Sequence, residues 1–401
     1  MHEVLSPAGD EEKLHAAVLF GADAVYLGGE FGMRSTQAGF RGEVLKRSVG
    51  YCHQNGVRVY LTVNTLPRNR EMDRLPSYLE EAWTCGVDAL IVSDLGVLSL
   101  VRKYVPSMEI HISTQAGVVN YETARCFYEM GAKRVVLARE LSLLEIAEIR
   151  ERTPAELELE AFVHGAMCMS VSGRCLISNY LTGRDANRGE CAQPCRWNYY
   201  LMEEKRPGEY FPVGEDENGA YILNAKDLCM LPYLDKLAEA GITSFKIEGR
   251  AKSSYYVSVV TNAYRIAMDL YEKEPNAYSV PPWLVEELQK VSHRRYSSGF
   301  YFDRPDQYLD DGGYIRNYDV AAVVEGYEEG RLRLLQKNKF AEGDRVEILE
   351  PGRAPVLFEI TGLQDEAGEP LAVANHPMAP AFVKSDLSFR PGSILRKQRA
   401  V

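Results

Sequence analysis

The 401-residue sequence lacks the features that mark membrane and secreted proteins. No stretch approaches the roughly 18 apolar residues of a membrane-spanning helix, and residues 1–7 do not form a basic leader followed by an apolar run. An excess of basic residues is also missing, because 46 Lys and Arg face 57 Asp and Glu, for a formal net charge of −11. We therefore expect a cytoplasmic protein without membrane contact. A surface that coats nucleic acid over its whole area is excluded, whereas one local basic face is not.

Signature motifs of common enzyme classes are absent too. The sequence holds no H-E-x-x-H, no G-x-S-x-G and, after its first predicted strand, no G-x-G-x-x-G. His164 has no evident Ser or Cys nucleophile with an orienting acid. The sequence thus gives no motif-based support for hydrolysis, or for dinucleotide binding by an open, doubly wound sheet.

A repeated unit organises the first 250 residues. A glycine and a short apolar run follow an amphipathic segment at 21–28, 86–93, 131–138 and 241–248. The glycine suits the left-handed position that ends a helix, and the apolar run suits a buried parallel strand. Alternating helices and parallel strands, with polar residues where the strands end, favour an α/β fold of the TIM-type (β/α)8-like barrel kind.

Five further strands are predicted at 4–5, 57–63, 110–113, 157–163 and 221–223. This makes nine candidates, whereas a (β/α)8 barrel has eight strands. We therefore expect 221–223 or a neighbour to be misassigned or to belong to an insertion. A long helix is predicted over 253–274 and a shorter one over 283–291. The predicted barrel domain covers residues 1–300, with a cysteine-rich insertion at about 164–229.

The sequence pattern changes after residue 300. A segment rich in Asp, Pro and Gly makes 301–316 the best candidate for a linker. Short alternating strands are predicted beyond it, separated by glycine-containing turns, at 320–324, 332–335, 345–349, 356–360 and 371–374. Residues 317–401 are therefore expected to form a small C-terminal all-β barrel domain. The basic run at 396–399 is interpreted as a solvated tail in preference to a binding element.

Five of the eight cysteines lie in the predicted insertion. They are Cys168, Cys175, Cys191, Cys195 and Cys229. In the cytosol such a group indicates metal binding or catalysis more often than disulfides. Structural zinc sites usually come as paired C-x2–4-C knuckles, whereas wide and uneven spacing suits an iron–sulfur cluster held between loops. Spacing alone leaves a cluster, zinc and free or redox thiols open. Cys52, Cys85 and Cys126 lie in apolar, helix-like contexts and are predicted to be core residues.

Arginines alternate with these cysteines, at Arg174, Arg184, Arg188 and Arg196. Guanidinium groups lower the pKa of nearby thiols in general, and they bind carboxylates or phosphates bidentately. Asp185 and Glu190 are equally good partners for them, so a purely structural role stays open. A second basic segment, which includes Lys246 and Arg250, forms the end of a predicted strand and can face the same opening.

Seven long segments resemble signatures of the collagenase-like peptidase family, peptidase family U32. They are Leu5–Asp10, Gly21–Gly29, Phe162–Cys168, Ser172–Cys175, Asn187–Trp197, Lys226–Cys229 and Lys246–Arg250. The resemblance covers essentially the whole chain, including a C-terminal β module that many members have. It implies, despite the family's name, an iron–sulfur protein of oxygen-independent hydroxylation.

The family branch that these motifs resemble most hydroxylates the wobble uridine of tRNA to 5-hydroxyuridine, with prephenate as the apparent hydroxyl source. The resemblance therefore implies a tRNA uridine hydroxylase with a [4Fe–4S] cluster, and with tRNA and a small dicarboxylate as its substrates. Because the match is to a two-subunit-like form, a paralogous partner subunit is a further expectation. Other branches act on a cytidine of large-subunit ribosomal RNA or in ubiquinone synthesis.

The same resemblance assigns roles to residues. The implied cluster ligands are Cys168, Cys175, Cys191 and Cys229, with Cys195 as an alternative because some relatives use a C-x3-C pair. Candidates for substrate and phosphate contacts are Arg174, Arg184, Arg188, Arg196, Lys246 and Arg250. His164 and Glu248 are the candidates for proton handling. Three alternatives stay open: a peptidase that acts on collagen-like proteins, an rRNA hydroxylase, and a non-catalytic RNA-binding partner subunit.

Overall fold

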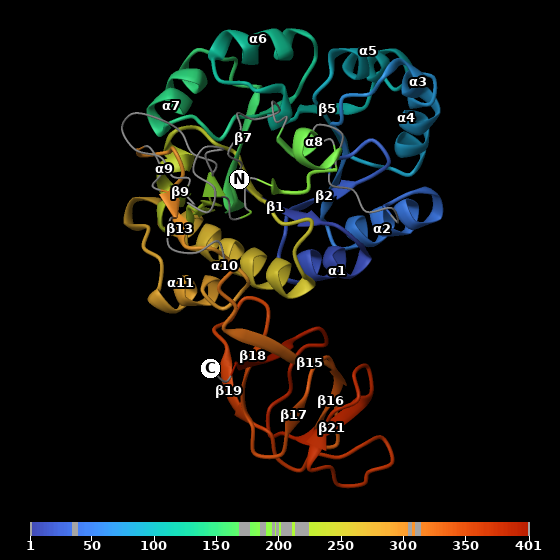
Figure 1. The fold of residues 1–401 in the computed structure, drawn as a ribbon, viewed down its shortest axis with the longest axis vertical. Helices are drawn as coiled ribbons and strands as arrows, with labels where there is room; N and C mark the ends of the chain where they lie inside the picture. The colour runs from blue at the N-terminus through green and yellow to red at the C-terminus, as the bar shows by residue number, and fades with distance from the viewer. Residues whose placement is uncertain are drawn as a thin grey trace.

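Eight parallel strands close a barrel in the computed structural model, which describes residues 2–33, 39–167, 177–184, 190–194, 197, 200–201, 211–212, 224–303, 307–308 and 314–399. The strands are β1 (Glu3–Ala8), β2 (Ala24–Gly28), β3 (Arg58–Val63), β4 (Ala89–Val92), β5 (Glu109–Ile112), β6 (Arg134–Val136), β7 (Glu158–Ala166) and β12 (Ser244–Ile247). They pair in chain order, and β12 closes the ring by pairing with both β7 and β1 (Figure 1). The predicted (β/α)8-like barrel is confirmed.

Eight of the nine predicted strands correspond to the barrel strands. The ninth, residues 221–223, lies outside the described residues. The next two residues form β10 (Asn224–Ala225), which pairs with β14 (Gln307–Tyr308) and not with a barrel strand. Two short strands extend the barrel sheet beyond β7: β11 (Asp227–Cys229) runs antiparallel to β7, and β13 (Tyr296–Ser297) runs parallel to β11. A separate antiparallel pair consists of β8 (Tyr200–Leu201) and β9 (Phe211–Pro212).

Helices alternate with most of the barrel strands along the chain. They are α1 (Glu11–Leu19), α2 (Gly42–Gln54), α3 (Asn69–Met72), α4 (Leu75–Thr84), α5 (Leu95–Tyr104), α6 (Tyr121–Glu129), α7 (Leu143–Glu151), α8 (Ile177–Thr182), α9 (Leu234–Glu239), α10 (Ser254–Lys273) and α11 (Pro282–Leu288). Oxygen-bearing side chains such as Asp10 and Ser253 cap the first turns by accepting from backbone N–H groups. The repeated glycines 21, 86, 131 and 241 follow helices with φ between 84° and 96°, as predicted for helix ends.

The predicted C-terminal all-β domain is confirmed as a six-stranded antiparallel sheet. Its order is β19 (Val356–Glu359), β18 (Arg345–Leu349), β22 (Ile394–Gln398), β15 (Tyr318–Glu328), β16 (Arg331–Gln336) and β21 (Pro380–Lys384), with β17 (Phe340–Ala341) and β20 (Val373–Ala374) paired separately. β21 and β22 were not predicted. The prediction that 396–399 form a solvated tail is wrong, because β22 is a central strand and the Arg396 side chain is fully buried.

The two domains are joined by packed and charged contacts, and in Figure 1 the β domain lies next to α10 and α11. Arg396 donates to Glu287 on α11 at 2.6 Å and to Glu347 on β18 at 2.7 Å. Lys290 bonds the same two carboxylates at 2.9–3.0 Å. Leu349 and Ile394 belong to the same buried apolar cluster as the barrel helices. An ion pair that is buried and shared by both domains holds them in one relative position.

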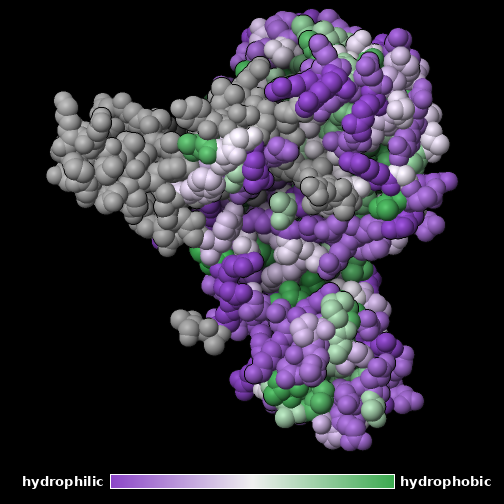
Figure 2. Space-filling view, turned by 45° about the vertical axis from the view of Figure 1, so that its right-hand side comes forward, coloured by the Kyte–Doolittle hydropathy of each residue, from purple (hydrophilic) through white to green (hydrophobic). Residues whose placement is uncertain are grey.

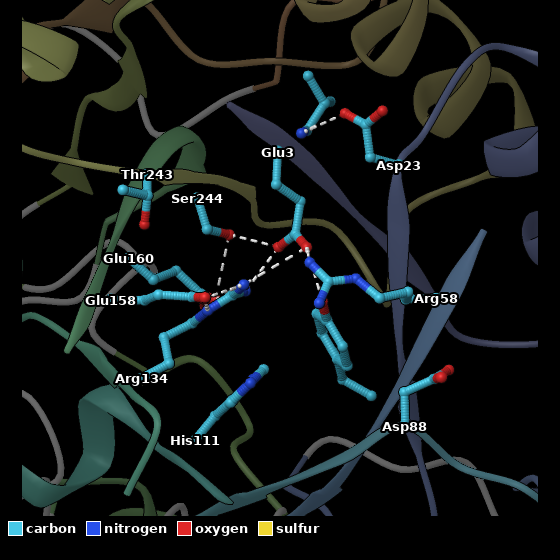
Figure 3. A network of polar contacts seen from close by, with 12 residues as sticks. Glu3, Asp23, Arg58, Asp88, His111, Arg134, Glu158, Glu160, Thr243 and Ser244 are labelled. Atoms are coloured by element: carbon cyan, nitrogen blue, oxygen red, sulfur yellow. Dashed lines mark hydrogen bonds and ion pairs between the residues drawn. The ribbon is translucent and has the colours of Figure 1, made fainter. Parts of the chain in front are cut away.

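A second buried ionic network fills the N-terminal end of the barrel (Figure 3). Arg134 donates to Glu3 at 2.5 Å, to Glu158 at 2.7 and 2.9 Å and to Glu160 at 3.0 Å. Arg58 and Tyr60 also donate to Glu3. Burial alone would raise the pKa of Glu3, but Arg134 and Arg58 outweigh it and lower that pKa to about 2. These groups lie at the starts of their strands, and in barrel enzymes that end contributes to stability.

Candidate functional site at the C-terminal end of the barrel

His164 lies near the end of β7, among aromatic rings. The rings of Tyr256, Tyr264 and Tyr296 lie 5.2–6.0 Å from the His164 ring, centroid to centroid. The hydroxyls of Tyr264 and Tyr296 lie 3.4 Å from Nδ1 and 3.5 Å from Nε2. Burial lowers the pKa of His164 to about 3, so the imidazole is neutral at physiological pH. If His164 handles protons, it does so as a neutral, buried imidazole. This role stays a prediction.

Gly165 shapes the end of β7. Its φ is +104°, a conformation that L side chains rarely adopt, and a Cβ at this position would lie 2.6 Å from the Glu248 carbonyl oxygen. The Glu248 N–H donates to the His164 carbonyl at 2.9 Å. A glycine at 165 therefore allows the β12–α10 loop, with the candidate residue Glu248, to approach β7 closely.

Replacing Gly165 with alanine is expected to lower the free energy of unfolding by about 2 to 4 kcal/mol, since left-handed strain and a backbone clash add together. Chemical denaturation of the Gly165→Ala variant measures the loss. Gly56→Ala is the matched control, because Gly56 also has a positive φ but no atom lies within 4 Å of the place that a Cβ would occupy. A Gly165→Ala protein no less stable than Gly56→Ala would contradict the close-approach argument.

Cys229 is the last residue of β11 and pairs directly with His164 across the sheet. It is partly buried, and desolvation raises the pKa of its thiol to about 11. Such a thiol stays protonated at neutral pH unless a metal ion replaces the proton. The same pairing places Asp227 opposite Ala166, two residues before Cys168. The raised pKa argues against a free redox thiol at Cys229, which would need a low pKa.

Cys191 lies in a tight turn. The backbone N–H of Gln193 donates to the Cys191 sulfur at 3.4 Å, and Gln193 adopts a positive φ of 57°. N–H groups that point at cysteine sulfurs stabilise thiolates and tune the potentials of iron–sulfur clusters. This local geometry fits a cluster ligand. Cys168, Cys175 and Cys195 lie outside the described residues, and within the described ranges no three His, Cys, Asp or Glu side chains form a metal-holding group.

The other three cysteines were all predicted to be core residues, and this is only partly right. Cys52 is buried, and burial raises the pKa of its thiol to about 12. Cys85 is only partly buried and Cys126 is exposed. The prediction for Cys126 is wrong, because it lies on the solvent side of α6, a helix whose only fully buried residue is Ala124.

A layer of cations and aromatic rings lies inside the barrel near the same end. The Arg139 guanidinium stacks 3.7 Å from the centroid of the Phe162 ring, and Lys246 lies 4.6 Å from that of Tyr26. Arg250 lies 5.5 Å from the Tyr26 centroid. The aromatic faces attract these cations and help to fix their positions.

Two carboxylates face these three cations. Lys246 bonds Glu160 at 2.6 Å, and Arg139 lies 3.7 Å from Glu248. Burial lowers the pKa of Lys246. Arg250 donates to Thr62 at 3.0 Å and to the Met33 carbonyl. The layer carries three positive and two negative side chains, and Glu160 also bonds Arg134 at 3.0 Å.

The predicted substrate-contact residues thus fall into two groups. Lys246 and Arg250 are both buried in the barrel, where protein groups already bond them. Arg184 is exposed just after α8, and Arg174, Arg188 and Arg196 lie outside the described residues. Arg139 was not predicted as a site residue; its position directly after the strand predicted at 131–138 was the available signal. The roles of all these residues stay predictions.

Comparison with known proteins identifies the family. A profile described as "Peptidase family U32" matches residues 9–311, and one described as "Peptidase family U32 C-terminal domain" matches residues 316–396. The chain belongs to peptidase family U32. The U32 match therefore extends over both the barrel and the antiparallel sheet domain.

Relatives in this family have different names. The chain is 37% identical to tRNA hydroxylation protein P1 of Bacillus subtilis over 401 residues, which cover 98% of this chain and 94% of the relative. It is 38% identical to a 23S rRNA 5-hydroxycytidine synthase of Escherichia coli, with 96% of this chain but 57% of the relative covered. It is 34% identical to a collagenase of Porphyromonas gingivalis, with 75% and 73% covered. Within the described ranges, no helix has the length and apolar character needed to cross a membrane.

Proposed function

We propose that this chain is an iron–sulfur enzyme that hydroxylates the wobble uridine of tRNA to 5-hydroxyuridine without molecular oxygen, with prephenate as the hydroxyl donor. The observation that carries the proposal is the 37% identity to a tRNA hydroxylation protein over 98% of this chain. This similarity includes the β domain as well as the barrel. The collagenase relative aligns with a smaller share of the chain, 75%.

The residues at the C-terminal end of the barrel support this chemistry. A [4Fe–4S] cluster bound by Cys168, Cys175, Cys191 and Cys229 would supply electron-transfer or Lewis-acid chemistry at the barrel mouth. The layer of Arg139, Lys246 and Arg250 has the charge to bind and orient a dicarboxylate.

Two further groups can act next to that layer. The neutral imidazole of His164, bounded by tyrosine hydroxyls, offers a hydrogen-bond donor and acceptor without a competing charge. Glu248, 3.7 Å from Arg139, can accept a proton beside that guanidinium.

Nucleoside mass spectrometry of tRNA from a deletion strain tests the proposed function. We expect 5-hydroxyuridine to disappear, to return with the wild-type gene, and to depend on added prephenate in a strain that cannot make it. Unchanged 5-hydroxyuridine in the deletion strain would overturn the proposal. Loss of 5-hydroxycytidine from ribosomal RNA in its place would identify the rRNA alternative.

The peptidase alternative is favoured by one observation, the 34% identity to a collagenase. It predicts cleavage of gelatin by iron-free protein, and cleavage that persists when Cys191 or Cys229 is replaced. The partner-subunit alternative predicts tRNA binding by the purified chain but no hydroxylation until a second protein is added.

A further inference from the structure

A polar groove lies where the β domain meets the barrel. Its volume is about 300 Å³. The barrel contributes Glu12, three serines and Tyr255, and the β domain contributes the cations Arg316, Lys337 and Arg399. In the space-filling view, the outline narrows where the two domains join, and most of the surface on either side is hydrophilic (Figure 2).

The groove is preformed, because the domain junction is held by buried groups. Tyr255 lines the groove, and its hydroxyl donates to the Lys290 carbonyl at 3.1 Å and accepts from the buried Arg396 at 3.3 Å. The Gly352 N–H in the β domain donates to Asn262 on α10 at 2.8 Å. A ligand that enters the groove therefore does not have to order the two walls, which lowers the entropic cost of binding.

The positive side chains of the groove are only partly neutralised. Arg316 is exposed and has no ion-pair partner among the residues that the structure describes. Lys337 lies 4.0 Å from Glu12, a weak and solvent-exposed pair. Arg399 is paired with Asp319 at 2.7 and 2.8 Å but is still 44% exposed. In a chain with a net charge of −11, such a local excess is what attracts a polyanion.

The groove opens on the same side of the barrel as the candidate site. Its barrel wall comes from the first residues of α1 and α10, and these helices follow the C-terminal ends of β1 and β12. The wall residue Ser292 precedes His293, whose ring stacks on Tyr296 at 4.6 Å, next to His164. A strand that lies in the groove can continue to the barrel mouth.

We propose that this groove binds the phosphate backbone of the RNA substrate, on the β-domain side of the barrel mouth. The inference rests on the proposed function and adds to it the surface that holds the RNA. Arg, Lys, Ser and Asn side chains are the usual donors to phosphate and ribose oxygens, and the groove carries side chains of each of these four types.

The test measures tRNA binding by the full-length, anaerobically purified protein between 50 and 200 mM salt. The double variant Arg316→Gln/Lys337→Gln is expected to weaken binding about tenfold at low salt. The slope of log Kd against log salt should fall by about 0.7 to 0.9 for each lost phosphate contact. Arg353→Gln is the matched control, because Arg353 is an exposed arginine of the same domain that pairs with Glu350 outside the groove.

A variant that should strengthen tRNA binding distinguishes an effect of charge from an effect of lost structure. Asp319→Asn removes the carboxylate partner of Arg399 and is expected to tighten tRNA binding and steepen the salt dependence. Unchanged Kd and slope in both groove variants would overturn the inference. This failure is distinct from that of the proposed function: normal binding by the variants, with 5-hydroxyuridine lost in the deletion strain, overturns the groove alone.

Discussion

Replacing Cys229 with alanine is expected to remove the iron–sulfur cluster and to abolish tRNA hydroxylation. Cys229 has a buried thiol whose pKa is raised to about 11, so only a bound metal makes it a thiolate. It is hydrogen-bonded in sheet register to β7, the strand that leads to Cys168. Anaerobic purification with iron and sulfide assays should give about four irons per wild-type chain and far fewer in the variant.

Two other cysteines make this experiment decisive. Cys126→Ala is the control, because Cys126 is exposed on α6, and we expect it to keep full iron content and activity. Cys195→Ala tests the alternative ligand set. If Cys195→Ala loses the cluster and Cys229→Ala retains it, the fourth ligand is Cys195. A full iron content in Cys191→Ala and Cys229→Ala alike would remove both residues from the ligand set.

Replacing Arg134 with methionine is expected to lower the free energy of unfolding by about 3 to 5 kcal/mol, because removing one partner leaves buried charges uncompensated. Arg134 is 1% exposed and bonds Glu3, Glu158 and Glu160 in the closed end of the barrel (Figure 3). Denaturant unfolding measures the loss. Arg353→Met is the control and should change stability by less than about 0.5 kcal/mol, as expected for an exposed pair.

The acid side of the stability profile gives a second test of this network. The folded-state pKa of Glu3 is about 2, below the ordinary value of 4.5. Its contribution to stability is therefore complete above pH 4.5 and is lost as the pH falls from 4.5 towards 2, by about 3 kcal/mol. Removing Arg134 raises the pKa of Glu3, so the variant should lose less stability over this window. Equal acid sensitivity of the two proteins would argue against the pairing.

The network is also expected to leave tRNA binding unaffected. Glu3, Arg134 and Glu158 lie at the N-terminal starts of their strands, whereas His164, Cys229 and Glu248 lie near the other end of the barrel. The folded fraction of Arg134→Met should therefore keep its KM for tRNA. A raised KM at full folding would mean that the closed end of the barrel affects RNA binding.

The barrel could be predicted from the sequence because its signals are local. Each glycine at 21, 86, 131 and 241 ends a helix and precedes an apolar strand, so neighbouring residues are enough to recognise the unit. The long helix predicted over 253–274 is α10, Ser254–Lys273. Strands that contain charged residues were harder to recognise. β22 contains Arg396 and Lys397, and these charges suggested a solvated tail because their partners could not be known from the sequence.

The candidate site was predictable in composition but not in arrangement. The cysteine spacing and the motif at 162–168 pointed to the region of the chain that contributes His164 and Cys229. Nothing near Cys229 in the sequence indicates that it pairs with His164. The two residues are 65 positions apart, and their strands, β11 and β7, run antiparallel. Arg139 became a candidate site residue because its side chain contacts Phe162 and Glu248, which come from other segments of the chain.

The sequence by itself determined the alternation of helices and strands, the change to an all-β domain and the family, since periodicity and long motifs are properties of neighbouring residues. The tertiary structure decided which charges are buried and paired. The sequence around a basic residue does not reveal whether its side chain is buried. Carboxylates from distant segments pair with three buried cations: Glu3 with Arg134, Glu287 with Arg396 and Glu160 with Lys246. The free energy of a buried charge depends on those partners and on desolvation, and both exist only in the folded chain.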